Sequence, residues 1–299
     1  MSNYNDIKDN EIRIIGNAEQ PTTTLRKPIY RRWWFWVAWI ALAVLTAVLI
    51  ALSMGRKPDD AATKTVENIE SAPVAPTVVK SEPAATVLVS DTSVNDVQMR
   101  IYTPVNAAPE LCIGYPDPSN NAIVLAFQAA DVRADNHEIL GAYVLKGEML
   151  SRGRSKKGFC AIIDGKIQLG MAESTPLLEE ATEKEGYFFR QYPLVLDGQM
   201  VQNKPKNKAL RHALCEYNGT IVTVSSMGME SLHDFAQALA DLGVQNAIYL
   251  VGADAYGFCH TQSNDTPETT TWGERQTGKT FEKVNFIIWR AYNPAYSNS

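Results

Sequence analysis

The feature that most constrains this chain is an apolar run from Trp33 to Met54. Its 22 residues include no Asp, Glu, Lys or Arg. As a helix rising ~1.5 Å per residue the run would reach ~33 Å, enough for the hydrocarbon core of a bilayer. A helix also satisfies its own backbone hydrogen bonds, as a lipid-crossing segment must. Four of the six tryptophans crowd its beginning, as in an interfacial aromatic belt. The run therefore predicts a single transmembrane helix, with the lipid bilayer as a partner.

The charges around this run predict its orientation. Four basic residues lie within 26–32, whereas Arg56 and Lys57 follow the run and are soon opposed by two aspartates. The positive-inside rule places the N-terminus in the cytoplasm and the C-terminal part in the periplasm or another extracytoplasmic space. A cleavable signal peptide is the alternative, but the run exceeds the usual apolar core of ~7–15 residues. We therefore predict an uncleaved signal anchor.

Composition divides the chain into four parts. Residues 1–32 form a polar tail that is predicted to be disordered. The transmembrane helix at 33–54 follows. Residues 55–93 are rich in Ala, Pro and Thr, which is typical of an extended linker. Residues 94–299 have a globular composition and are numerous enough for one domain with its own core.

The predicted domain contains more strands than helices. β-branched and aromatic residues are concentrated in eight segments, at 97–102, 122–128, 160–163, 194–196, 212–217, 220–224, 247–251 and 284–289. Asp-Gly or Asn-Gly pairs predict tight turns at 164–165, 197–198 and 218–219. The Asn-Gly pair is the strongest hairpin signal, because it accepts the positive φ angles of a type I′ turn.

One helix is predicted clearly, at 231–242. Its apolar residues recur at helical spacing, Ser231 is a possible N-cap, and Gly243 stands where a helix C-terminus favours glycine. The expected fold class is therefore α+β: a single transmembrane helix, a linker, and one mixed, largely antiparallel α+β domain.

Composition and motifs exclude several classes of function. The net charge of −5 does not indicate the basic surface that nucleic-acid binding requires. Phosphate-loop, dinucleotide, metalloprotease and nucleophile-elbow motifs are absent, and the four histidines lack paired ligand spacing, so no metal or cofactor is predicted. The Lys-rich segments 152–158 and 204–211 are most simply solvated loops, although either could contact a phosphate. The four cysteines could form disulfides, in any of three pairings, or remain buried thiols.

A succession of segments is more specific than any single motif. It consists of LGAYVLKGEMLSRGRSKKGFCAIIDGKI (140–167), YPLVLDGQM (192–200), LRHALCEYNGTIVTVSS (210–226) and ESLHDFAQALADLGVQNAIYLVG (230–252). The succession resembles the phosphodiester glycosidase domain over roughly residues 120–290. The resemblance implies a hydrolase that splits the bond between the anomeric carbon of a sugar and a phosphate oxygen, with a carbohydrate or sugar-phosphate as substrate.

The resemblance also implies site residues. Asp197 and Gly198 match the strand-turn of the family pattern, Arg211 matches its Arg-Thr-Ala segment, and Gly252 matches its final loop. Asp197 could be catalytic, because glycosyl transfer uses carboxylates as acid, base or nucleophile; the alternative is a plain Asp-Gly turn. Arg211 is the best phosphate ligand, since its guanidinium fork suits phosphate oxygens.

The chain departs from the family pattern in the final loop. Where the family has Leu-Asp-Gly-Gly-Gly-Ser-Ser, this sequence reads LVGADAY, so that Val251 replaces the aspartate. Asp254 could supply the lost carboxylate. His212 stands where the family has threonine and could act as an acid or base, although a strand histidine with a satisfied hydrogen bond is the simpler interpretation.

The polar loop QAADVRADNHE (128–138) could approach the final loop. In that case Asp135, His137 and Asp254 would form a site; otherwise the loop is a hydrophilic connection. The sequence thus predicts a membrane-anchored hydrolase of glycosyl phosphodiesters in envelope polymers or glycans. The alternative is a catalytically degenerate relative of the same fold that binds sugar-phosphate or scaffolds an envelope assembly.

Overall fold

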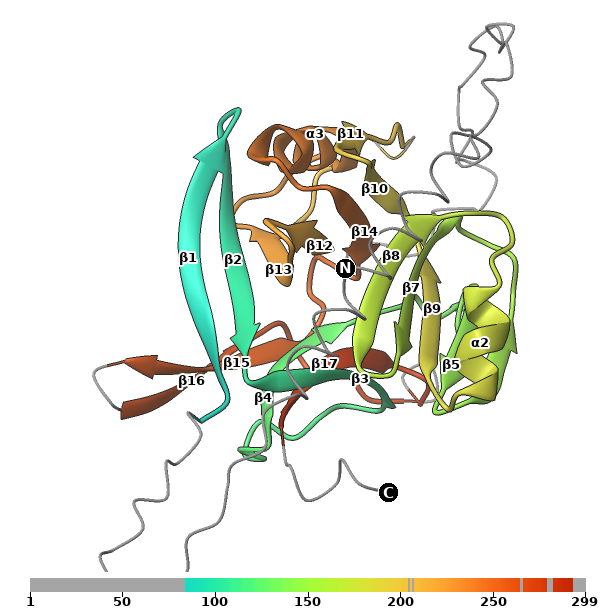
Figure 1. The fold of residues 1–299 in the computed structure, drawn as a ribbon. Helices are drawn as coiled ribbons and strands as arrows, with labels where there is room; N and C mark the ends of the chain where they lie inside the picture. Colours follow the sequence, from blue (N-terminus) through green and yellow to red (C-terminus); the bar gives the residue numbers. More distant parts are fainter. Residues whose placement is uncertain (1–83, 204, 206, 264–265, 279–281, 293–299) are drawn as a thin grey trace, which may run out of the picture. The chain divides into compact units, whose positions relative to one another are not determined.

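The computed structural model describes residues 84–203, 205, 207–263, 266–278 and 282–292. This part of the chain contains seventeen strands and two helices. The strands form three sheets, and neighbouring strands within each sheet are antiparallel (Figure 1).

The expected α+β class is wrong, because the domain is mostly β. Several strands escaped prediction because their side chains face water and lack an apolar pattern. The clearest case is β16 (Thr266–Trp272), in which every residue before Trp272 is exposed. It pairs with β15 (Gly257–Ser263) in a hairpin at a sheet edge.

The predicted membrane segment cannot be compared with the structure. Residues 33–54 lie outside the described residues, as do the tail 1–32 and most of the expected linker. Within the described ranges, neither helix has the length and apolar character that a bilayer crossing requires. The strand β1 (Thr86–Val94) begins inside the stretch expected to be linker.

The largest sheet has seven strands and combines distant parts of the sequence. Its order is β1, β2 (Val97–Val105), β13 (Thr220–Ser226), β12 (His212–Tyr217), β14 (Asn246–Leu250), β10 (Pro193–Leu196) and β11 (Gln199–Met200). The helix α3 (Leu232–Leu242) packs on one face of this sheet through a buried cluster that includes Leu232, Phe235 and Leu239.

Two five-stranded sheets complete the domain. One has the order β16, β15, β4 (Ile123–Gln128), β17 (Asn285–Ala291) and β3 (Ala107–Ile113). The other has the order β6 (Glu148–Arg152), β5 (Ala142–Leu145), β9 (Tyr187–Gln191), β7 (Gly158–Ile163) and β8 (Lys166–Met171). The short helix α2 (Leu177–Glu183) packs against this second sheet (Figure 1).

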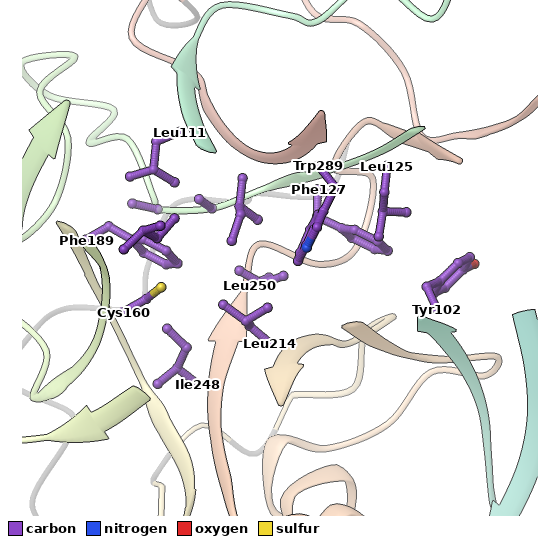
Figure 2. Packing of buried hydrophobic residues seen from close by; sticks show 14 of the residues in the cluster. Tyr102, Leu111, Leu125, Phe127, Cys160, Phe189, Leu214, Ile248, Leu250 and Trp289 are labelled. Carbon is purple, nitrogen blue, oxygen red and sulfur yellow. The ribbon is translucent and has the colours of Figure 1, made fainter. Parts of the chain in front are cut away.

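The main core lies where the three sheets meet (Figure 2). Phe127 of β4, Phe189 of β9 and Leu214 of β12 are fully buried in the same cluster. Burial of each such side chain stabilises the fold by roughly 1.5–3 kcal/mol. All four cysteines are free thiols, and three of them, Cys160, Cys215 and Cys259, are buried.

The predicted hairpin at 218–219 is confirmed. It joins β12 to β13, and its two turn residues have positive φ angles, 51° at Asn218 and 72° at Gly219. The predicted helix at 231–242 is confirmed as well. The Ser231 hydroxyl accepts a hydrogen bond from the Asp234 amide, and Gly243 ends the helix in the left-handed conformation.

Candidate functional site

Three loops meet at one end of β12 and β14, two interior strands of the large sheet. The Val251 amide donates to the Gln128 carbonyl at 3.1 Å, so the chain leaves β4 and β14 at neighbouring points. The Ala253 amide donates to the Leu210 carbonyl at 2.9 Å, which adds the segment before β12. The polar loop 128–138 and the final loop therefore start side by side.

A partly buried ion pair lies beside this meeting point. The Lys156 ammonium donates to the Asp131 carboxylate and, at 3.0 Å, to the side-chain carbonyl of Gln191. The Lys156 side chain is 1% exposed, whereas that of Asp131 is 32% exposed. The Asp131–Lys156 pair thus combines a cation sealed in protein with a carboxylate that solvent, and hence a ligand, can reach.

Two tyrosines extend the pair toward β14. The Lys156 ammonium lies 4.1 Å from the ring centroid of Tyr192, a cation–π contact, and the rings of Tyr192 and Tyr249 are 6.3 Å apart. The Tyr249 hydroxyl accepts hydrogen bonds from the Gly252 amide at 3.2 Å and from Arg211 at 3.4 Å. Burial raises the pKa of Tyr249, and the neighbouring Arg211 offsets part of this rise.

Arg211 is buried and bound mainly to backbone. Its Nε donates to the Glu230 carbonyl at 2.9 Å, and one terminal nitrogen donates to the Asn207 carbonyl. These bonds fix the segment before β12 against the turn before α3. Its role as a phosphate ligand stays a prediction; the structure places its charge next to Tyr249, on the side of the sheet that carries the Asp131–Lys156 pair.

His212 follows Arg211 in sequence but points to the other face of the sheet, as consecutive strand residues do. Its Nδ1 lies 2.8 Å from the Ser225 hydroxyl oxygen, and its ring is 5.2 Å from that of Phe127 in the main core. Burial lowers the pKa of His212 to about 4. The imidazole is therefore neutral at pH 7.

Gly252 is required by a close approach of two backbone segments. A Cβ atom at this position would lie 2.2 Å from the Leu210 carbonyl oxygen and 2.8 Å from the Tyr249 hydroxyl. No side chain fits there without moving the loop. The match of Gly252 to the family pattern therefore has a packing explanation.

Asp197 and Gly198 lie far from the other candidates. They form the turn between β10 and β11, where the Gly198 amide donates to the Gln245 carbonyl at 2.8 Å. Gln245 precedes β14 and Gly252 follows it, so the five-residue strand separates the two places by on the order of 15 Å.

The remaining predicted residues lie in the two loops. Asp135 is exposed and pairs with Arg133 at 2.7 Å, and that hydrogen-bonded pair lowers the pKa of Asp135 to about 2. His137 has a positive φ of 60°, and its Nδ1 is buried without a hydrogen-bond partner among the described residues. Asp254 is exposed, and its backbone carbonyl accepts from the Glu274 amide at 3.4 Å. Their roles stay predictions.

Sequence reasoning missed the residues that make the central contacts, namely Asp131, Lys156, Gln191, Tyr192 and Tyr249. The only available signals were general ones: Asp131 lies in the polar loop, and Lys156 lies in the Lys-rich segment 152–158. The structure shows that one lysine of this segment is buried. As for metals, no group of three or more His, Cys, Asp or Glu side chains in the described ranges could share an ion.

Comparisons with known proteins show the family of this chain. The sequence model of the phosphodiester glycosidase family matches residues 121–281, a range that holds every residue of the site described above. No curated protein matches the chain.

Two solved structures are similar at low identity. One is the catalytic domain of zebrafish N-acetylglucosamine-1-phosphodiester alpha-N-acetylglucosaminidase, auto-inhibited by its pro-peptide. It is 12% identical, with a TM-score of 0.48, over 72% of this chain and 85% of that chain. The other is a hypothetical protein from Synechocystis, 14% identical, with a TM-score of 0.47, over 71% of this chain and 64% of that chain.

Proposed function

This chain belongs to the phosphodiester glycosidase family, and from that membership we propose that it hydrolyses glycosyl phosphodiesters at the Asp131–Lys156 pair. The observation that supports this location is the contrast in exposure within the pair. The carboxylate is open to a ligand, while the ammonium behind it is sealed and fixed.

The reaction needs groups of both charges. Glycosyl transfer passes through an oxocarbenium-like transition state, which a carboxylate stabilises. The leaving phosphate carries negative charge, which a fixed cation stabilises without reorganisation. Asp131 supplies the accessible carboxylate, and the sealed Lys156 supplies a positive charge behind it that acts through space, without contacting the ligand.

We assign Asp131 as the base of this hydrolysis. A water oxygen bonds to the anomeric carbon while the bond from that carbon to the phosphate oxygen breaks, and the electron pair leaves with the phosphate. Asp131 accepts the proton of the attacking water. Asp254, in the adjoining loop, is the proposed second carboxylate, because the substitution of Val251 leaves that loop without the aspartate of the family pattern.

Val251 also favours a second candidate, a relative that binds sugar-phosphate without cleaving it. Its half-buried side chain cannot act as acid, base or ligand. Under this alternative the Asp131–Lys156 pair holds the ligand and nothing activates water.

One experiment separates the two candidates. The full-length protein is incubated with a panel of sugar-1-phosphodiesters, and sugar release and binding are measured in parallel. We expect release that is lost in Asp131→Asn and kept in Asp96→Asn, which makes the same change in the exposed turn between β1 and β2. Binding without release in the unmodified protein would select the second candidate.

We also propose that the domain acts outside the cytosol, on envelope polymers or glycans. This proposal rests on the charges that flank residues 33–54 in the sequence. External protease should then digest the domain in intact cells or spheroplasts; protection until the cells are lysed would contradict it.

A further inference from the structure

A groove runs between the β5–β6 hairpin and α2. Its deeper part has a volume of about 600 Å³ and is lined by residues that include Ala142, Arg152, Arg154 and Leu178. A second hollow of about 300 Å³ shares Arg152 and Leu178 with it. The two hollows therefore form one continuous depression along the helix.

The groove lining carries charges of both signs, with more cations than carboxylates in its larger part. Arg152 and Arg154 are exposed, and neither forms an ion pair with any described residue. Lys157 is paired with Glu173 at 2.6 Å, and Glu179 and Glu183 also line the groove. The two arginines are thus the charges available to an anion.

The backbone that carries these arginines is held in place. The buried Arg190 guanidinium donates to the carbonyls of Lys156, Ala172 and Glu173, at 3.2, 2.6 and 3.1 Å. It thereby ties the segment 152–157 to the chain that follows β8. A fixed backbone lowers the entropy that ligand binding would cost.

Part of the groove lining is apolar. Ala142 of β5, Met149 of β6 and Leu178 of α2 are among the lining residues. Such a surface suits the C–H face of a sugar ring, whereas guanidinium groups suit phosphate oxygens. A ligand that alternates sugar and phosphate would match both.

The groove adjoins the Asp131–Lys156 pair. The segment 152–157 supplies Arg152 and Arg154 to the groove and Lys156 to the pair. It packs on Gly141, since a Cβ on Gly153 would lie 3.0 Å from the Gly141 Cα. The preceding Leu140 amide donates to the Asp131 carbonyl at 2.8 Å. Only two loop segments separate the two places.

We propose that this groove binds the anionic repeats next to the one that is cleaved, so that the substrate is a chain of several sugar-phosphate repeats. The inference rests on the proposed function for the position of the cleaved bond. It adds the class of substrate: a polymer or oligomer with a phosphodiester in each repeat, in preference to a single sugar-1-phosphodiester.

The first test measures binding and needs no turnover. Short-chain inorganic polyphosphate is titrated into the full-length protein at two salt concentrations. The double variant Arg152→Gln/Arg154→Gln should bind roughly tenfold more weakly, with a smaller dependence on salt, because two charge-assisted contacts are lost. The control Lys166→Gln/Lys184→Gln removes the same charge from residues outside the groove lining and should bind as the unmodified protein does. Equal affinity of both double variants would overturn the proposal.

The second test compares oligosaccharide esters of three repeats and of one repeat. The unmodified protein should have a lower KM for the longer ester, and the ratio of the two KM values should fall toward one in Arg152→Gln/Arg154→Gln. An unchanged ratio, with hydrolysis intact, would reject the groove and keep the proposed reaction. Polyphosphate binding that depends on the arginines, without hydrolysis of either ester, would keep the groove and reject the reaction.

Discussion

Across neighbouring strands, the imidazole Nδ1 of His212 lies 2.8 Å from the hydroxyl oxygen of Ser225. The two residues are directly paired in the register of β12 and β13, and both are buried. Burial at this position, beside the main core, makes a residue that the sequence offers as an acid or base a neutral group.

The burial of His212 predicts a loss of stability in mild acid. Burial holds the pKa of His212 at about 4, below its ordinary 6.5, so between these values the unfolded chain binds a proton that the native state does not. The free energy of unfolding should therefore fall as pH drops from 6.5 toward 4, by up to ~3 kcal/mol from this group. Denaturant unfolding at pH 7 and pH 5 measures the effect. His212→Asn should flatten the profile, whereas His233→Asn, on the exposed face of α3, should not; parallel profiles in all three proteins would refute the assignment.

The Asp131–Lys156 pair predicts an asymmetric pair of single substitutions. Asp131→Asn leaves a buried ammonium without its counter-ion and should lower the free energy of unfolding by roughly 2–4 kcal/mol, somewhat less than for a fully buried pair. Adding Lys156→Met should restore most of that loss. Urea unfolding of the single and double variants gives the coupling free energy; additive effects would show that the two charges do not interact.

Gly252 predicts a steric effect on the site. Gly252→Ala places a methyl group 2.2 Å from the Leu210 carbonyl oxygen, so the final loop must shift, at a cost of about 1–3 kcal/mol. The matched control is Gly228→Ala, where the nearest atom to the new methyl is a flexible carboxylate oxygen at 3.6 Å. Thermal unfolding of the two variants measures the effect, and Gly252→Ala should have the lower melting temperature. Equal melting temperatures would mean that the loop yields without strain.

The thiols should be unreactive in the native protein. Burial raises the pKa of Cys112 and of Cys259 to about 11, and it raises the pKa values of Cys160 and Cys215 further. Since the thiolate is the reactive form, a disulfide reagent at pH 8 should modify the folded chain slowly, with Cys112 first because it is the least buried. In denaturant all four should react at once. Rapid native reaction of Cys160 or Cys215 would contradict their burial.

Local signals explain which elements the sequence predicts. The Asn218-Gly219 turn and the Ser231 cap are short-range features, and the hairpin and α3 follow from them directly. Strands such as β16 have no buried face, so no apolar alternation marks them, and the β content was underestimated.

The site could not be predicted in the same way, because its contacts join distant segments. Lys156 meets a carboxylate 25 residues earlier and an amide 35 residues later. Nothing near Lys156 in the sequence indicates that it is buried while Arg154 is exposed. That distinction arises from Gln191 and Tyr192, which only the pairing of β9 with β7 brings beneath it.

The order of the large sheet has a consequence for synthesis on the ribosome. The strand β2 lies beside β13, more than a hundred residues later in the chain. The hairpin of β1 and β2 is therefore synthesised early, and one edge of it has no partner strand until more than a hundred further residues have been translated. A C-terminal truncation that removes β13 should leave the edge of β2 without a partner strand and make the truncated chain prone to aggregate.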